Sequence, residues 1–241
     1  MRVCALIPVY NEASHIREVV KGCLKHVEAV FVVDDGSADG SAQLARAAGA
    51  TVVRHPKNLG KGVALKTGFR EVLREPTWDA VIVLDGDGQH NWDEIPKFLS
   101  TMKGGACDIV VGNRMKNVRS MPLERTTTNW LSSRILTALT GQKIRDSQCG
   151  FRLVKTHVLR GLVLRTRKYD TESEMLVEAA RKGFRIGNVP IQTIYAGQQS
   201  KIRPVLDTLR FVRLAIGFLF RGKGIRPVGS GRKGGNAHAR P

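Results

Sequence analysis

The sequence Val81-Ile-Val-Leu-Asp85-Gly-Asp87-Gly-Gln89-His90 is the strongest single indication of how this 241-residue chain folds. A short apolar run rich in β-branched residues is typical of a buried strand in a parallel sheet. The run ends in two carboxylates, Asp85 and Asp87, and Gly86 between them lets the backbone approach a ligand closely. Ligands of open α/β sheets bind beyond the carboxyl ends of the strands. We therefore predict that both carboxylates lie at such a binding edge.

Asp85, Asp87 and Gln89 also place three side-chain oxygen donors within five residues of chain. Mg²⁺ and Mn²⁺ prefer oxygen ligands and often complete their coordination shell with substrate phosphates. A lone Asp-x-Asp is more often only a polar turn after a strand. The metal hypothesis, a Mg²⁺ or Mn²⁺ ion held by these three residues, therefore depends on the motifs in the rest of the chain.

The positive charge of the chain is confined to two segments. Lys and Arg number 39 against 21 Asp and Glu, for a net charge of +18, yet residues 1–112 carry a net charge of −1. Residues 113–168 carry +11 and residues 201–241 carry +9. This confinement favours one face that meets an anionic partner over a globally basic surface. A basic nucleic-acid-binding protein is the remote alternative, but the sequence contains no recognised nucleic-acid-binding motif.

Cysteine usage and hydropathy indicate the compartment. The four cysteines form no C-x-x-C pair and no zinc spacing, which favours a reducing environment; they are Cys4, Cys23, Cys107 and Cys149. The N-terminus does not resemble a signal peptide, and no apolar stretch reaches the length needed to span a bilayer. We expect a cytoplasmic protein that is soluble or peripheral on the cytoplasmic face of a membrane.

The first half of the chain alternates between strand and helix patterns. Strand patterns cover residues 3–9, 29–33, 51–54, 80–84 and 108–111, and helix patterns cover 13–26, 41–48, 62–74 and 93–102. Strict alternation predicts an α/β fold with a mostly parallel, twisted sheet and helices on both faces.

The pattern changes after Gly112. We expect a basic loop over 114–127, helices over 129–139 and 171–182, an extended segment over 186–194 and an amphipathic helix over 204–220. The predicted domain spans 1–222, in two halves at 1–112 and 113–222. The Gly- and Arg-rich tail, 223–241, is expected to be disordered.

Polar residues follow several of the predicted strands. Tyr10 and Glu12 follow the first strand, and Asp34 and Asp35 follow the second, so these side chains should converge with the Asp85 pair on one crevice. A stacking tyrosine, a carboxylate for a base or ribose, and a metal-binding pair together describe a nucleotide-diphosphate site. The sequence has neither a Walker A loop nor a G-x-G-x-x-G after the first strand, which disfavours those two nucleotide-binding folds.

At this point the chain resembles glycosyltransferase family 2, and within it the dolichol-phosphate mannose synthase and dolichyl-phosphate glucosyltransferase group. The resemblance runs from Ile7 to about Phe211 and rests on seven motifs in order. They are Ile7-Pro-Val-Tyr-Asn-Glu12, Val33-Asp-Asp-Gly-Ser37, Asn58-Leu-Gly-Lys-Gly62, Asp85-Gly-Asp-Gly-Gln-His90, Gly112-Asn-Arg114, Asp146-Ser-Gln-Cys-Gly-Phe151 and Ser200-Lys201. The resemblance implies a GT-A-type single domain with an added C-terminal amphipathic helix, in which 1–112 is the nucleotide-sugar half and 113–222 the acceptor half.

The resemblance also implies roles for residues that match the family's motifs. The nucleotide-binding set is Pro8, Tyr10, Glu12, Val33, Asp35, Asp85 and Gly86. The metal set is Asp85, Asp87 and Gln89, with Mg²⁺ or Mn²⁺ as cofactor. Asp87, Arg114 and Lys201 are implied as catalytic residues. Tyr195 stands roughly where such synthases often have an arginine, so this chain departs from the pattern in the acceptor region.

The implied reaction is metal-dependent transfer, with inversion, of a sugar from a nucleotide-diphosphate donor to a polyprenyl phosphate at an anionic membrane surface. A phosphate acceptor is already anionic and needs no general base. The alternative is a hydroxyl acceptor, which needs a carboxylate base, for which Asp146, Glu172 and Glu174 are the candidates.

Several other side chains have two open interpretations at this point. His90 is expected to form a structural hydrogen bond, Cys149 to pack rather than react, and Asp34 to sit in a turn. Lys61 fits either a solvated loop or a phosphate contact. The apolar residues of the C-terminal segment, including Leu209, Phe218 and Phe220, are expected to face the membrane.

Overall fold

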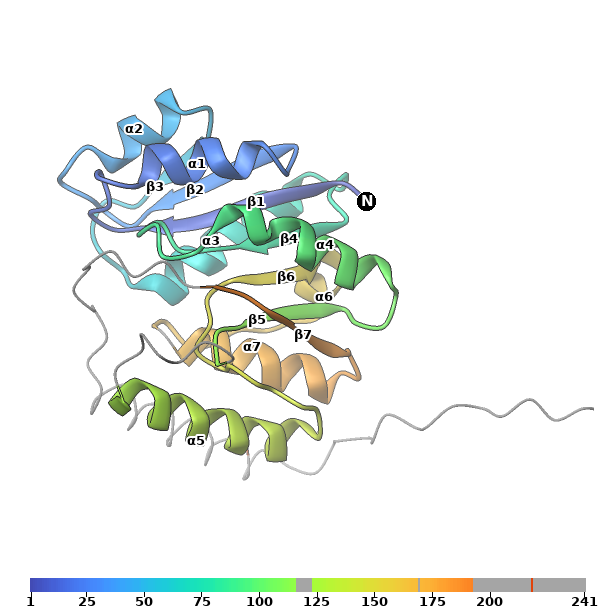
Figure 1. Cartoon of the computed structure of the whole chain (residues 1–241). Helices are drawn as coiled ribbons and strands as arrows, with labels where there is room; N and C mark the ends of the chain where they lie inside the picture. The colour runs from blue at the N-terminus through green and yellow to red at the C-terminus, as the bar shows by residue number, and fades with distance from the viewer. Residues whose placement is uncertain (116–122, 169, 193–217, 219–241) are drawn as a thin grey trace, which may run out of the picture.

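The computed structural model of the chain describes residues 1–115, 123–168, 170–192 and 218 (Figure 1). Its strands are β1 (Val3–Val9), β2 (Ala29–Asp34), β3 (Thr51–Arg54), β4 (Ala80–Val83), β5 (Ile109–Asn113), β6 (Arg152–Lys155) and β7 (Ile186–Pro190). Its helices are α1 (Ile16–Leu24), α2 (Ser41–Ala47), α3 (Lys61–Arg74), the 3-10 helix η1 (Trp92–Glu94), α4 (Ile95–Lys103), α5 (Leu123–Thr140), α6 (Thr156–Gly161) and α7 (Asp170–Arg181).

All seven strands form one sheet in the order β3-β2-β1-β4-β6-β5-β7. Only β6 is antiparallel to its neighbours, β4 and β5. Because of this reversal, β6 starts at the edge where β4 ends: Arg152 pairs with Val83. The loop before β6 therefore lies at the same edge as the carboxyl ends of the parallel strands.

Helices cover both faces of the sheet. In Figure 1, α1, α2 and α4 lie in front of it, and α3, α6 and α7 lie behind it. The helix α5 packs against α7 at the end of the molecule far from α2 and β3 (Figure 1). Close packing of α3 on β1 requires Gly68, because a Cβ atom there would lie 2.2 Å from Leu6 Cδ1.

The core is continuous from β2 through to β7, and every residue of β1 and β4 is buried. Strands that are buried on both faces need continuous apolar runs, which is what the sequence supplies in both. All four cysteines are buried and none is in a disulfide. The prediction that Cys149 packs within the core is confirmed, since its side chain is fully buried.

The predicted α/β fold is confirmed, and β1 and β3 have the bounds predicted for them. The predicted loop over 114–127 is wrong in its second part, because α5 begins at Leu123. The early turns of α5 contain Thr126-Thr-Thr128, which have weak helix propensity, so the apolar periodicity is visible only from Asn129. The short elements β6 and α6 were not predicted.

The predicted C-terminal helix, 204–220, and the tail lie outside the described residues except for Phe218. The Phe218 side chain is 2% exposed, its carbonyl accepts a hydrogen bond from Arg181, and the Arg181 guanidinium lies 4.8 Å from the centre of its ring. The expectation that Phe218 faces a membrane is therefore wrong, because it packs against α7. Among the described residues, no helix has the length and apolar character needed to cross a bilayer.

Candidate active site

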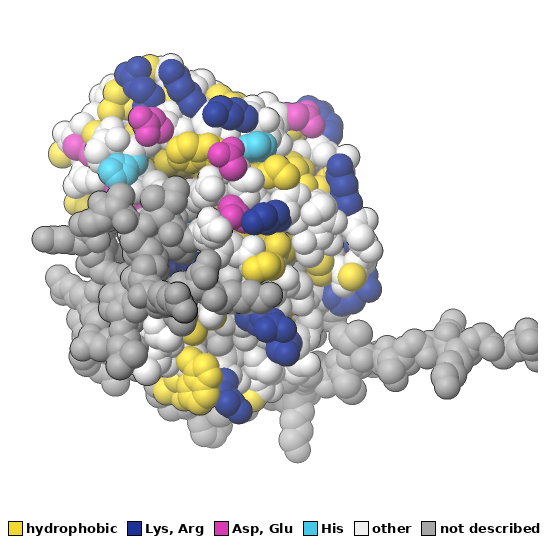
Figure 2. All heavy atoms as spheres, viewed as in Figure 1, with side chains coloured by type: hydrophobic (Ala, Val, Ile, Leu, Met, Phe, Trp, Pro, Cys, Tyr) yellow, Lys and Arg dark blue, Asp and Glu magenta, His cyan; other side chains and the backbone are white. Residues whose placement is uncertain are grey.

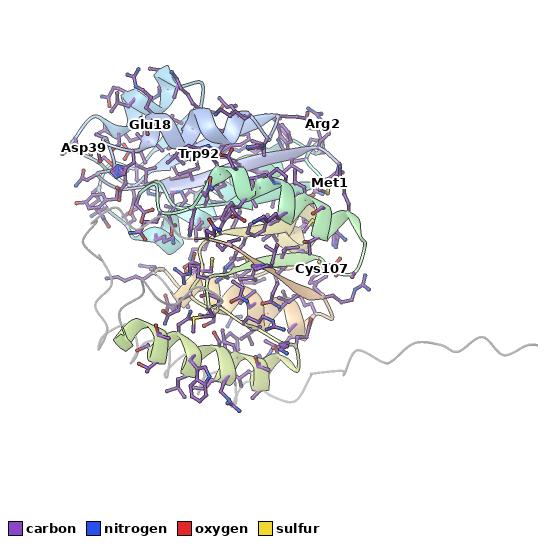
Figure 3. The ribbon with its side chains drawn as sticks, viewed as in Figure 1. Met1, Arg2, Glu18, Asp39, Trp92 and Cys107 are labelled. Atoms are coloured by element: carbon purple, nitrogen blue, oxygen red, sulfur yellow. The ribbon has the colours of Figure 1, made fainter. Side chains whose placement is uncertain are left out.

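The carboxyl ends of β1, β2 and β4 meet at one edge of the sheet. In the register of β1 and β2, Pro8 pairs with Val33 and Val9 with Asp34. Asp39, in the loop after β2, lies on this side of the molecule, opposite Met1 and Arg2 at the start of β1 (Figure 3). The predicted convergence of the first, second and fourth strands is thus present.

The loops that follow β1 and β2 are fastened to each other. The main-chain N–H of Asn11 donates to Ser37 Oγ, and the N–H of Glu12 donates to Ser41 Oγ, both at 2.9 Å. Asn11 has a φ of 54°, a left-handed conformation that asparagine tolerates better than most residues. These contacts hold Tyr10, 39% exposed, and Glu12 at the rim of the site.

Asp34 and Asp35 are both buried and both bind protein groups. Asp34 is the last residue of β2 rather than a turn residue, and its carboxylate accepts a hydrogen bond from the N–H of Ser37 in the loop that follows. The Asp35 carboxylate, in a residue that is 3% exposed, accepts hydrogen bonds from the N–H groups of Leu59 and Gly60 and contacts His55 Nδ1 at 2.7 Å. Asp35 therefore ties the end of β2 to the loop that leads into α3.

The Asp85 carboxylate lies in an ion-pair cluster. Lys61 Nζ is 2.6 Å from Asp85 Oδ1 and 3.2 Å from Glu172 Oε1. Asp35 anchors the turn before α3, and Lys61 is the first residue of that helix. The Lys61 ammonium is therefore held directly against the Asp85 carboxylate. The interpretation of Lys61 as a solvated loop charge is therefore wrong, because its side chain is only 17% exposed.

The two aspartates of the pair differ in protonation behaviour. Burial would raise the pKa of Asp85, but Lys61 and His90 beside it hold that pKa below its ordinary value. Burial raises the pKa of Asp87, and the negative charge of Asp85 raises it further; Glu12 is close enough to contribute. Two neighbouring carboxylates, one held ionised and one that resists ionisation, are a setting that a divalent cation would stabilise.

His90 has the structural role expected for it. Its Nδ1 accepts a hydrogen bond of 3.1 Å from the main-chain N–H of Asp85, so its proton is on Nε2 in the neutral ring. Burial lowers the pKa of His90, and its ring stacks on Phe151 with the centroids 5.2 Å apart. His90 thereby fixes the backbone at which β4 turns into the Asp85-Gly-Asp87 loop.

Arg114 is held by Asp146. Its Nε donates to Asp146 Oδ2 at 2.8 Å and its NH2 group donates to Oδ1 at 2.9 Å, while Asn129 Nδ2 donates to Oδ1 at 2.7 Å. Burial alone would raise the pKa of Asp146, but the Arg114 charge and these hydrogen bonds lower it. The bidentate pair places a rigid cation near Asp85, whose pKa it helps to lower.

Arg152 is a functional candidate that sequence reasoning missed. Its buried guanidinium donates to the carbonyl oxygens of Ser147, Cys149 and Glu172. It therefore joins the loop that carries Asp146 to the first turn of α7, which carries Glu172. The available signal was a single arginine within the otherwise apolar run 151–154.

Glu174 fastens another basic segment near the site. Its buried carboxylate accepts hydrogen bonds from the N–H groups of Arg165 and Thr166 and from Thr166 Oγ1. Lys66 Nζ donates to the Thr166 carbonyl, and a Cβ atom on Gly60 would lie 2.9 Å from the carbonyl oxygen of Arg167. The segment 165–168, with three basic side chains, is thus held against the start of α3.

The residues at the edge fit a divalent cation whose shell is completed by another molecule. Asp85 and Asp87 supply carboxylate oxygens, and the Gln89 N–H donates to Asp87 Oδ1 at 3.0 Å, which fixes the turn. Within the described part of the chain, no group of three or more His, Cys, Asp or Glu side chains is placed to hold a metal ion. A diphosphate would supply the missing oxygen ligands.

The structure brings some of the predicted site residues together at the carboxyl edge of the sheet and leaves others buried or already bound to protein groups. Tyr10, Glu12, Asp85, Asp87 and Arg114 share the carboxyl edge of the sheet, and Gly86 lies between the two aspartates. Pro8 and Val33 are buried and pair with each other in the sheet, and the Asp35 carboxylate already accepts hydrogen bonds from the protein. Lys201 lies outside the described residues.

Comparison with known proteins agrees with this geometry. Residues 4–162 match the family described as glycosyl transferase family 2. The chain is 32% identical, over 213 residues, to UDP-N-acetylglucosamine–dolichyl-phosphate N-acetylglucosaminyltransferase from Methanococcus voltae, covering 79% of this chain and 84% of that one. It is 30% identical to undecaprenyl-phosphate mannosyltransferase from Micrococcus luteus, covering 79% and 83%.

Solved structures share the fold at lower identity. Mannosyl-3-phosphoglycerate synthase from Rubrobacter xylanophilus superposes with a TM-score of 0.74 at 16% identity, covering 92% of this chain and 74% of that one. Glucosyl-3-phosphoglycerate synthase from Mycobacterium tuberculosis, solved with Mn²⁺, UDP-glucose and phosphoglyceric acid, gives 0.69 at 21% identity, covering 90% and 78%. The sheet, its carboxyl-edge site and the sequence match together place this chain in glycosyl transferase family 2, and it is a glycosyltransferase.

Proposed function

We propose that this glycosyltransferase moves a sugar from a nucleotide-diphosphate donor to a polyprenyl phosphate, with a divalent cation, at the surface of a membrane. The acceptor class is supported by the two relatives above, whose names specify dolichyl and undecaprenyl phosphate. Solved structures of the same fold contain Mn²⁺ or Mg²⁺ with UDP, which supports the cofactor.

The observation that carries the acceptor proposal is that the three candidate bases already have protein partners. Asp146 is paired with Arg114, Glu172 lies against Lys61, and Glu174 accepts hydrogen bonds from the segment 165–166. A hydroxyl acceptor would need a carboxylate that is free to take its proton. A phosphate monoester is already anionic, so it attacks without a base.

The chemistry assigns each described residue a simple task. When bound, Mg²⁺ or Mn²⁺ stabilises the negative charge that develops on the departing diphosphate. Asp85 and Asp87 hold the cation at the edge of the sheet, and Tyr10 and Glu12 border the nucleoside. Arg114, kept rigid by Asp146, attracts the acceptor phosphate and lowers its repulsion from the donor. A single displacement would invert the sugar's anomeric carbon.

The membrane part of the proposal is supported by α5. Trp130 and Leu131 are each 53% exposed on this helix, and the Arg134 guanidinium lies 4.8 Å from the centre of the Trp130 ring. An exposed tryptophan and leucine beside a basic residue suit the interface of an anionic bilayer. Among the described side chains on the face drawn in Figure 2, Lys and Arg are scattered among other side-chain types.

A donor screen tests the proposal. The full chain is incubated with a short-chain polyprenyl phosphate, Mg²⁺ or Mn²⁺, and UDP- or GDP-linked sugars, and the lipid product is separated and identified. We expect transfer to the phosphate and none to the matching polyprenol. Transfer to the polyprenol at an equal rate would contradict a phosphate acceptor.

The metal requirement has its own test. Asp87→Asn should abolish transfer, and EDTA should silence the wild type until Mg²⁺ or Mn²⁺ is restored. Because the Gln89 N–H bond can be kept by the amide oxygen, the variant should retain its fold and thermal unfolding temperature. Full transfer by Asp87→Asn without metal would remove the metal hypothesis.

A further inference from the structure

Lys61 stands at a position where a helix does not favour a cation. It is the first residue of the 14-residue helix α3, and the positive end of the helix dipole lies there. The opposing stabilisation comes from Asp85 at 2.6 Å and Glu172 at 3.2 Å. Burial would lower the pKa of Lys61, but the charges of Asp85 and Glu172 raise it, so the side chain remains an ammonium ion.

The pair of Lys61 and Asp85 is closely packed. A Cβ atom on Gly150 would lie 2.8 Å from Asp85 Oδ2 and 3.1 Å from Lys61 Nζ. The loop before β6 thus lies directly against both charged groups, and its glycine leaves just enough room for them. Asp85 Oδ1 contacts Lys61, and both Asp85 oxygens lie close to Gly150.

A divalent ion that approaches Asp85 from solution therefore meets a positive charge beside the carboxylate. Without other ligands, the ion meets an Asp85 carboxylate that Lys61 largely neutralises. The described part of the chain also has too few carboxylates there to complete the ion's coordination shell. A nucleoside diphosphate changes both conditions, because its oxygens supply ligands and its charge offsets the ammonium.

We propose that Lys61 is a resident counter-cation of Asp85, which keeps the divalent ion from binding alone and makes its binding depend on the donor diphosphate. This inference rests on the metal dependence in the proposed function. Lys61 acts as a positioning residue in it: it holds the Asp85 carboxylate in place before the donor arrives. The ion and the nucleotide then bind as a unit.

The test measures Mn²⁺ binding and needs no turnover. Free Mn²⁺ is followed by electron paramagnetic resonance at pH 8 with the full-length wild type and with Lys61→Met, first without nucleotide. Removing a buried like charge beside the ligand should strengthen binding of Mn²⁺ alone by at least about tenfold. Lys61→Arg is the matched control, because it keeps the positive charge and should bind Mn²⁺ alone as weakly as the wild type.

A second series adds saturating UDP or GDP. In the wild type, nucleotide should tighten Mn²⁺ binding. In Lys61→Met this gain in affinity should be smaller, because the positive charge that opposes Mn²⁺ is already absent. Lys61→Gln repeats the comparison should Lys61→Met fail to fold, as judged by thermal unfolding. Mn²⁺ binding alone that is equal in the wild type and in the neutral variants would overturn the inference while the proposed function stands. No Mn²⁺ binding by the wild type even with either nucleotide would instead overturn the proposed metal dependence, and this inference with it.

Discussion

Arg114 and Asp146 show how much of the site depends on one ion pair. Asp146 is fully buried, and its ionised form is held by Arg114 and Asn129. A buried carboxylate that loses its cation keeps the full cost of desolvation. The pair thus couples the position of a proposed acceptor-binding cation to the stability of the loop before β6.

This coupling predicts a pH-dependent effect of Arg114→Met. The pKa of Asp146 lies below its ordinary value of 3.8 in the folded protein, so the pair contributes its stability above that pH and loses it as the pH falls through the folded value. The variant should lower the free energy of unfolding by about 3 kcal/mol at pH 7. Urea unfolding between pH 7 and pH 3 should show this difference shrinking as the pH falls, because Asp146, left buried without its cation in the variant, takes up a proton at a higher pH than it does in the wild type. A difference that is constant across this range would contradict the pair's role.

The residues of the site were predictable to different degrees. Asp85 and Asp87 could be placed from sequence, because a strand pattern fixes where its end must lie. The Asp35 carboxylate could not be assigned in this way, since its binding of Leu59 N–H depends on a loop that is distant in sequence. Glu172 was visible only as a possible base, and its contact with Lys61 required the packing of α7 beside α3.

Among the elements, β6 connects the site to the opposite edge of the sheet within four residues. It is four residues long and antiparallel to its neighbours, so its first residue, Arg152, lies at the carboxyl edge of the parallel strands, where the site is. Its last residue, Lys155, pairs with Asp108 toward the opposite edge at 3.0 Å. Arg152, beside the site, can therefore be compared with Lys155, which lies away from it on the same strand.

We expect Arg152→Met to be far more damaging than Lys155→Met. The first change leaves three buried carbonyl groups without their donor, which should cost roughly 3–5 kcal/mol of unfolding free energy. The second removes one partly exposed pair and should cost at most about 1 kcal/mol. Arg152→Lys reaches fewer carbonyls, so at a temperature where it is folded it should still turn over more slowly, with kcat lowered. Turnover of Arg152→Lys equal to that of Lys155→Met would show that β6 does not position the site.

The antiparallel strand also marks the limit of element prediction. Alternation of strand and helix patterns was sufficient for β1 to β5, where each strand contains at least two consecutive apolar residues. It failed for β6 because four residues that begin with a buried arginine and end with a lysine carry no clear period. It failed for the start of α5 because Thr126-Thr-Thr128 are poor helix formers.

For the whole molecule, the proposed orientation on a membrane follows from where α5 lies. It is at the end of the molecule far from α2 and β3 (Figure 1), and it lies within the segment 113–168, whose net charge is +11. Each basic residue near an anionic surface contributes about 1 kcal/mol of attraction, which salt screens. Burial of Trp130 and Leu131 would add attraction that salt does not screen.

Liposome binding checks this orientation. The wild type should bind anionic liposomes with an affinity that weakens, without vanishing, as salt rises. Changing Trp130 and Leu131 together to Ser should weaken binding by on the order of tenfold or more and slow transfer to long-chain lipid more than to a short, soluble analogue. Leu24→Ser on α1, an exposed leucine away from α5, is the control and should bind as the wild type does. Equal losses in the control would contradict an oriented surface.

The four buried cysteines make this orientation directly measurable. Burial raises the pKa of Cys4, Cys23 and Cys149 to about 12, so they carry almost no thiolate at neutral pH, and Cys107 is buried as well. The native protein should therefore take up no maleimide while folded, which makes it a silent background for site-specific labelling. A Trp130→Cys variant should accept one polarity-sensitive dye, whose emission shifts to the blue when liposomes are added; the same dye on Leu24→Cys should report only water.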